Sequence, residues 1–206
     1  MSASSSIRAV AFDVDGVLVR LRFPEALPRV LGTSAEATKQ FFRGPFLKCL
    51  LDEADLRDEL PPYLERWQWA GSLDEFLAFW FTADSDLHEP CIAFIDRLRA
   101  TGRRCYLASS QEKHRAAYLT DQMGLGRRVD GTFFSCHVGL KKPDPRYFRL
   151  IQSSLGVAPH EILFLDDHET NVAAARELGW RAVHFRAGDS IDDIAAEFDL
   201  FPERAL

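Results

Sequence analysis

The chain has 206 residues, of which 47% are hydrophobic and 27% charged, and its formal net charge is -6 at pH 7. This length allows one sizeable core and a small accessory domain, while the acidic balance argues against a nucleic acid as the main partner, because counterion release requires clustered Lys and Arg. The polar start MSASSSIR has no apolar core and no segment reaches membrane-spanning length, so we expect a cytoplasmic protein that does not engage a membrane.

The first predicted element is a short buried strand that ends at Phe12 and is followed by two aspartates. Side chains alternate along a strand, so Asp13 and Asp15 project to the same side if the extended conformation continues. Two such carboxylates persist close together when a cation lies between them, when one is protonated, or when the chain turns, and Gly16 offers that turn. A calcium loop is the alternative, but it needs further oxygen ligands downstream, and residues 17–19 are aliphatic.

Residues 21–87 have a helical pattern without a convincing strand, and we expect them to form a small all-helical domain. The predicted helices span residues 25–31, 34–43, 47–51, 56–69 and 72–81, with an interruption at Pro61-Pro62 and a capping box made by Ser72 and Glu75. The block is rich in aromatic residues, most of which we interpret as a bundle core rather than a ligand site. They are Phe41, Phe42, Phe46, Trp67, Trp69, Phe76, Phe79, Trp80 and Phe81.

From Glu89 onward, apolar strands alternate with amphipathic helices. Strands are predicted at residues 104–108, 132–135, 162–165 and 182–185, and helices at 91–98, 111–123, 145–155 and 169–178. Continuous apolar strands joined by such helices predict an α/β fold with a doubly wound parallel sheet, formed by residues 1–20 and 88–206. Ligands of such sheets bind at the carboxyl ends of the strands.

Polar side chains follow several of the predicted strands, which would place them at one edge of the sheet. They are Asp13 and Asp15, then Ser109 and Ser110, then Asp166 and Asp167, together with Lys142 in GLKKPDP. Taken singly, each has an ordinary explanation as a turn serine, a surface lysine or a helix-capping aspartate. Together, a carboxylate nucleophile, a hydroxyl donor, a cation and further carboxylates for a metal indicate a phosphoryl-transfer site.

The segments FDVDGVL, LASS, KKPDP and LFLDDHETNVAAA resemble, in this order, the four motifs of the haloacid dehalogenase superfamily of aspartate-nucleophile phosphatases. The resemblance spans essentially the whole chain. It is to the subfamily with a helical cap after the first motif, and it implies that residues 21–87 are a cap that closes over the site.

The resemblance also implies catalytic roles by position. Asp13 attacks the phosphorus and becomes an aspartyl-phosphate, while Asp15 protonates the leaving oxygen and then activates the hydrolytic water. Ser109 donates its hydroxyl to the phosphoryl oxygens, together with Lys142, which offsets the negative charge. Lys142 is the matching lysine because it directly precedes Pro143.

The same resemblance implies a Mg²⁺ site made by Asp13, the backbone carbonyl of Asp15, and Asp167, with Asp166 acting through water. Two positions depart from the common pattern. Ser110 stands where many relatives have Asn, so its hydrogen bond to substrate has a different reach. The fourth motif has two adjacent aspartates, Asp166 and Asp167. Which of them contacts the metal directly is therefore assigned by analogy with the family alone.

We therefore predict a Mg²⁺-dependent phosphatase that hydrolyses a small phosphorylated metabolite, such as a sugar phosphate or a nucleotide. Asp15 fits ester hydrolysis or phosphate migration, so a phosphomutase similar to beta-phosphoglucomutase is an alternative. A second alternative is a non-catalytic protein of this fold that works by binding. A phosphoreceiver domain is disfavoured by the long insertion after Asp15. The sequence leaves the oligomeric state open.

Overall fold

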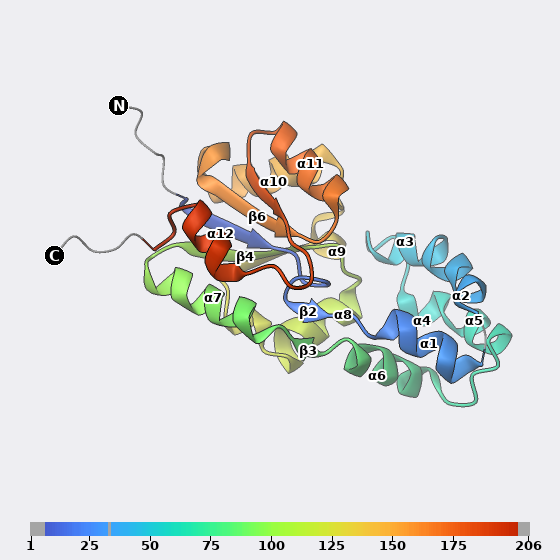
Figure 1. Ribbon diagram of the computed structural model, residues 1–206. Helices are drawn as coiled ribbons and strands as arrows, with labels where there is room; N and C mark the ends of the chain where they lie inside the picture. The colour runs from blue at the N-terminus through green and yellow to red at the C-terminus, as the bar shows by residue number, and fades with distance from the viewer. Residues whose placement is uncertain (1–6, 33, 202–206) are drawn as a thin grey trace, which may run out of the picture.

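A five-stranded parallel sheet forms the centre of the computed structural model, which describes residues 7–32 and 34–201 (Figure 1). Its order is β5-β4-β1-β6-β7. The strands are β1 (Ala9–Phe12), β4 (Arg104–Ser109), β5 (Gly131–Phe134), β6 (Ile162–Asp166) and β7 (Arg181–His184). Because all five strands are parallel, their carboxyl ends lie at one edge of the sheet, and the strand order reverses around β1, between β4 and β6.

Each strand presents alternate residues to two helical layers. Phe12 and its neighbours on one face pack under α7 (Glu89–Ala100), α8 (Lys113–Ala117) and α12 (Ile191–Glu197). Ala11 and the other face pack under α10 (Pro145–Leu155) and α11 (Glu169–Glu177), which lie above the sheet in Figure 1. The predicted α/β fold with a doubly wound parallel sheet is confirmed. None of the helices in the described part of the chain is long and apolar enough to cross a bilayer.

Shorter turns of helix complete the sheet-containing part. A π-helical turn (Tyr118–Gln122) continues α8, where one regular helix is predicted over residues 111–123. It is followed by a 3-10 turn (Leu125–Arg127), then by α9 (Ser135–Val138) and a second 3-10 turn (Pro159–Glu161).

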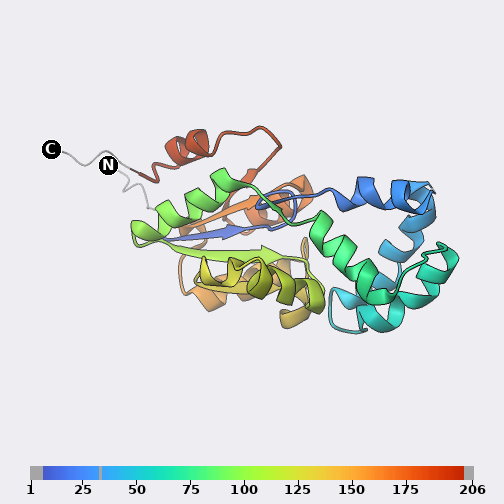
Figure 2. The ribbon, with the colours of Figure 1, turned by 90° about the horizontal axis from the view of Figure 1, so that it is seen from below.

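Six helices follow the first strand and form a separate cluster at the end of the molecule toward which the strands point (Figures 1 and 2). They are α1 (Phe23–Leu31), α2 (Ala35–Phe42), α3 (Pro45–Cys49), α4 (Leu56–Glu59), α5 (Pro61–Arg66) and α6 (Leu73–Ala83). The cluster has its own aromatic core, which includes Phe41 and Phe76. The capping box of Ser72 and Glu75 is present as predicted. The domain limits at 21 and 87 stay a prediction.

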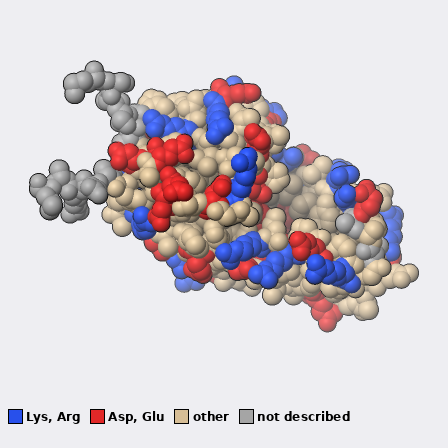
Figure 3. All heavy atoms as spheres, in the orientation of Figure 1, with Lys and Arg blue, Asp and Glu red and all other residues tan. Residues whose placement is uncertain are grey.

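A two-stranded antiparallel ribbon joins the two parts. It consists of β2 (Val19–Arg20) and β3 (Asp86–Leu87), and it pairs Val19 with Leu87. The sequence predicts no strand in residues 21–87, so β3 corrects that expectation. Strands of two residues carry no readable periodicity, and the two strands that pair here lie far apart in the sequence. On the face shown in Figure 3, acidic and basic side chains are interspersed over both parts.

Candidate active site

The chain changes direction directly after β1, and this turn presents Asp13 and Asp15. The amide of Asp13 still donates to the Leu165 carbonyl at 2.9 Å, so β1 stays paired with β6 as far as this residue. Asp13 is buried and its Oδ1 accepts a bond from the Val14 amide at 2.7 Å. Gly16 then takes a φ of 82°, a left-handed conformation in which a side chain would be strained.

A buried lysine lies between two of the predicted site carboxylates. The Nζ atom of Lys142 is 2.8 Å from an oxygen of Asp13 and 2.6 Å from Oδ2 of Asp166. Burial works against the charge of Lys142, but the two carboxylates outweigh it and raise its pKa above the ordinary value. The Asn171 amide donates to both oxygens of Asp166, at 2.9 and 3.1 Å. The structure therefore brings together residues of three separate motifs.

Asp15 has a different environment from Asp13. Its Oδ2 accepts a bond of 2.8 Å from Gln111, whose Nε2 also lies 3.0 Å from Ser109 Oγ. Its Oδ1 is buried and, among the described residues, has no hydrogen-bond partner, although Arg115 Nη2 is 3.7 Å away. Burial raises the pKa of Asp15, against the opposing effects of Arg115 and Gln111. Such a carboxyl is suited to hold a proton.

The two serines at the end of β4 line the same cavity but differ in exposure. Ser109, the last residue of β4, is buried beside Gln111. Ser110 is half-buried and lines the open space in front of Asp13 and Lys142, a cavity of about 350 Å³. Lys141 lines the same cavity, so the neighbour of Lys142 is also close to the site.

The acidic end of β6 offers oxygen atoms suited to a hard cation. Each carboxylate oxygen of Asp166 already accepts bonds from the chain, including one of 2.8 Å from the His168 amide. The side chain of Asp167 instead lies against Gly16. A Cβ atom added to Gly16 would be only 2.3 Å from Oδ2 of Asp167. One potential ligand atom from each of Asp166, Asp167 and His168 lies within 4.8 Å of the others. The donor chemistry and this close approach at glycine fit a divalent cation.

A family model described as haloacid dehalogenase-like hydrolase matches residues 7–179. The chain belongs to the haloacid dehalogenase-like hydrolases. Its motifs at the ends of β1, β4 and β6 all lie within the matched region. The predicted family is confirmed.

Curated relatives of this haloacid dehalogenase-like hydrolase include a flavin mononucleotide hydrolase of Arabidopsis thaliana. It is 37% identical over 73 residues, a match that covers 35% of this chain and 30% of the plant protein. The chain thus spans under a third of that relative. A phosphatase of Mycobacterium tuberculosis, MT3486, is 29% identical over 203 residues, which cover 93% of this chain and 94% of the relative.

A solved structure of the same fold is the HAD family enzyme bt-2542 of Bacteroides thetaiotaomicron, described as a complex with magnesium and inorganic phosphate. It aligns with a TM-score of 0.78 at 21% identity, covering 92% of this chain and 99% of that one. This similarity supports the fold of the hydrolase described above.

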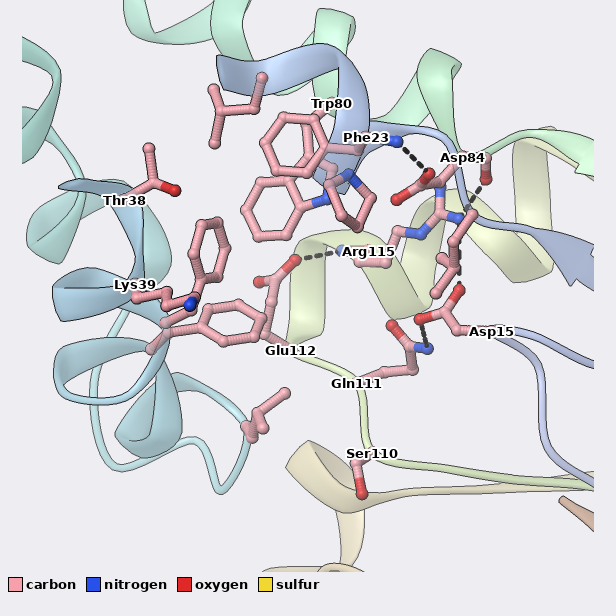
Figure 4. Close-up of a pocket in the computed structure, with 16 residues that line it drawn as sticks. Asp15, Phe23, Thr38, Lys39, Trp80, Asp84, Ser110, Gln111, Glu112 and Arg115 are labelled. Carbon is pink, nitrogen blue, oxygen red and sulfur yellow. Dashed lines mark hydrogen bonds and ion pairs between the residues drawn. The ribbon is translucent and has the colours of Figure 1, made fainter. Parts of the chain in front are cut away.

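Sequence reasoning missed several polar residues that surround Asp15 in this hydrolase. Gln111 and Arg115 contact it directly, and Glu112 and Asp84 lie nearby in a second cavity (Figure 4). Gln111 follows LASS by one residue, but no spacing rule marks it as a partner of Asp15. Arg115 falls in the helix predicted over residues 111–123 and belongs to none of the four motifs, and it is 4% exposed in the structure.

Proposed function

We propose that this haloacid dehalogenase-like hydrolase is a Mg²⁺-dependent phosphatase that hydrolyses a monoester of a small phosphorylated metabolite. Sugar phosphates and nucleotides are the first classes to test. The observation that carries the proposal is the buried contact of Lys142 with Asp13 and Asp166. Beside it lies the carboxyl of Asp15, whose Oδ1 has no hydrogen-bond partner among the described residues. The phosphatase name of the mycobacterial relative, which matches 93% of this chain, supports the same reaction.

In the first step, an oxygen of the Asp13 carboxylate attacks the phosphorus, and the bond from phosphorus to the ester oxygen breaks. Asp15 gives its proton to that departing oxygen, so an alcohol leaves and an aspartyl-phosphate remains on Asp13. Lys142 reduces the repulsion between the attacking carboxylate and the phosphoryl oxygens, because its ammonium group lies 2.8 Å from Asp13.

In the second step, Asp15 takes a proton from water, and the resulting hydroxide attacks the same phosphorus. Inorganic phosphate leaves, and the Asp13 carboxylate and the protonated Asp15 are restored. The Gln111 amide donates hydrogen bonds to both Asp15 and Ser109, and it keeps these two side chains in fixed positions relative to each other through both steps. Ser109 and Ser110 would bind phosphoryl oxygens.

Asp13, the backbone carbonyl of Asp15, and Asp167 would hold Mg²⁺. Asp167 is the better direct ligand because both oxygens of Asp166 already accept bonds from Lys142, Asn171 and the backbone. When bound, the ion offsets negative charge on the phosphoryl group. Residues 21–87 would act as the cap that excludes bulk water during transfer.

Phosphate release with and without Mg²⁺ tests the proposal, in the wild type and in Asp13→Asn, over a panel of sugar phosphates and nucleoside monophosphates. Removing the nucleophile should lower turnover by at least about a thousandfold. Asp121→Asn, an exposed aspartate, is the matched control and should keep full activity. Equal turnover by Asp13→Asn would exclude the aspartyl-phosphate mechanism.

A further inference from the structure

A second cavity of about 350 Å³ begins at Asp15 and extends into the helical part, as Figure 4 shows. It shares Asp15, Leu21 and Ser110 with the cavity in front of Lys142. A phosphate ester held at Asp13 would therefore direct its alcohol portion into this space, since Asp15 lies at the junction of the two cavities. Its volume is at the small end of the range of ligand pockets.

Aromatic rings form much of the wall. Phe42, Phe46 and Trp80 surround one another, with each pair of ring centroids 5.5 Å apart. Phe23 stacks on Trp80 at 4.8 Å and 14°. Trp80 and Phe23 are buried, whereas Phe42 and Phe46 are only half-buried, so part of their ring surface faces the cavity. Phe42, Phe46 and Trp80 therefore line the cavity and also pack in or against the aromatic core of the helical part, as predicted for most of these rings.

Several polar side chains of the wall are already engaged by the protein itself, among them Lys39, which pairs with Glu36 at 2.6 Å, whereas Oδ1 of Asp15 has no hydrogen-bond partner among the described residues. One oxygen of Asp84 accepts from the amides of Arg22 and Phe23, at 2.7 and 2.8 Å. Arg115 donates to the carbonyl oxygens of Phe81 and Asp84.

Glu112 and Gln111 are engaged in the same way. Glu112 caps α8 by accepting from the amides of His114 and Arg115, and its carboxylate is directed toward the rings in Figure 4. The Gln111 amide bonds Asp15 and Ser109. A leaving group with many hydroxyls would lose its bonds to water here and find few free partners.

From these contacts we infer that the alcohol portion of the substrate carries a flat aromatic ring, which stacks against Phe42, Phe46 and Trp80. The inference rests on the proposed function, because it assumes that a phosphate ester binds at Asp13. It narrows the substrate class to monophosphates of aromatic alcohols and disfavours polyhydroxylated sugar phosphates. Aromatic rings gain from offset and edge contacts beyond the area that they bury, which favours a flat ring over an aliphatic one.

Three esters of primary alcohols test this preference without changing the reacting atoms: benzyl phosphate, cyclohexylmethyl phosphate and glucose 6-phosphate. We expect kcat/KM for benzyl phosphate to exceed that for cyclohexylmethyl phosphate by about threefold to tenfold. It should exceed that for glucose 6-phosphate by on the order of a hundredfold. Equal values, or a higher value for the sugar, would overturn the inference.

Acetyl phosphate separates the inference from the proposed function, because its small leaving group does not reach the rings. Hydrolysis of acetyl phosphate without any preference for benzyl phosphate overturns the inference alone. Absence of phosphate release from all four compounds overturns the proposed function. The inference is then decided by binding, measured calorimetrically with benzylphosphonate and cyclohexylmethylphosphonate: tighter binding of the aromatic compound supports it, and equal binding overturns it.

Two phenylalanine variants test whether the rings of this wall cause the preference for an aromatic ligand. Phe46→Leu should reduce the preference for benzylphosphonate over cyclohexylmethylphosphonate to about twofold or less, because a ring of the wall is lost. Phe79→Leu removes a ring of the same kind and similar burial that does not line the cavity, and it should leave the preference unchanged. An unchanged preference in Phe46→Leu, or an equal loss in Phe79→Leu, would contradict the assignment of the ring to this wall.

Discussion

Lys142 has a structural role as well as a proposed catalytic one. It is 5% exposed, and it lies between two carboxylates that would repel each other without it. Removing one partner of a buried ion pair leaves uncompensated charge, which is costlier than removing the whole pair.

We predict that Lys142→Ala lowers the free energy of unfolding by about 3–5 kcal/mol, because Asp13 and Asp166 remain buried without a cation. Urea denaturation followed by circular dichroism measures this change. Lys141→Ala is the neighbouring control, and it should change stability by less than about 0.5 kcal/mol. If both variants unfolded at the same urea concentration as the wild type, the two carboxylates would not depend on Lys142.

For single residues, the sequence predicted which side chains at the strand ends would lie close together, because the topology of the sheet determines it. Ser109 and Asp166 end strands of the parallel sheet and Asp13 directly follows one, so their convergence follows from the direction and order of the strands. The contacts of Arg115 could not be predicted, because its partners are carbonyl oxygens at the end of a helix about thirty residues earlier. Such contacts depend on how separate parts pack.

Among the elements, α4 is connected to the sheet-containing part through its N-cap residue, Asp55. Asp55 caps α4 by accepting from the Arg57 amide at 2.8 Å. It also lies 2.7 Å from His114 Nε2 and 2.9 Å from Lys113 Nζ, both on α8. One carboxylate thus serves a helix start and a contact between two helices far apart in sequence.

These contacts make part of the stability dependent on pH. Burial alone would raise the pKa of Asp55, but hydrogen bonds from His114, the Arg57 amide and Lys113 lower it well below its usual range. A carboxyl whose pKa is lowered by folding stabilises the fold above its unfolded pKa, about 3.9, and that contribution is lost as the pH falls through the folded value.

We therefore predict that Asp55→Asn, which retains a capping side chain, is less stable than the wild type by about 1 kcal/mol at pH 7. The difference should shrink progressively below about pH 4. Urea titrations of both proteins between pH 3 and 7 measure it. A difference that stayed constant down to pH 3 would show that the charge of Asp55 is not the stabilising feature.

In the whole molecule, Arg115 joins the sheet-containing part to the end of α6. Its guanidinium donates to the carbonyl oxygen of Phe81 at 3.0 Å and to that of Asp84, and it lies over the rings of Phe81 and Tyr118. Because this guanidinium is buried and bound to backbone oxygens, it holds the end of α6 against the sheet-containing part.

We predict that Arg115→Met speeds amide hydrogen exchange in residues 81–88 by roughly fivefold to a hundredfold, because two carbonyl groups lose their donor. Mass spectrometry of exchanged peptides measures this rate. Arg127→Met, at an exposed position, should leave it unchanged. Unaltered exchange in Arg115→Met would mean that other contacts hold the two parts together.

The division of the molecule into two parts was predictable because residues 21–87 lack strand periodicity and are rich in aromatic residues. The resemblance predicted a cap over the site, but the contacts that hold the helical part in place could not be predicted. The ribbon of β2 and β3 consists of two-residue strands, and the aromatic wall forms only when α1, α2, α3 and α6 come together. Both features depend on long-range packing rather than local pattern.

The ribbon of β2 and β3 also bears on how such a protein can evolve. Its paired residues, Arg20 and Asp86, place the exit and the return of the chain side by side. A lineage can therefore lengthen, shorten or exchange everything between them while the sheet and its strand-end residues stay as they are. We expect the two parts to change at different rates, with selection for the chemistry acting on the sheet and selection for new substrates acting on the insertion.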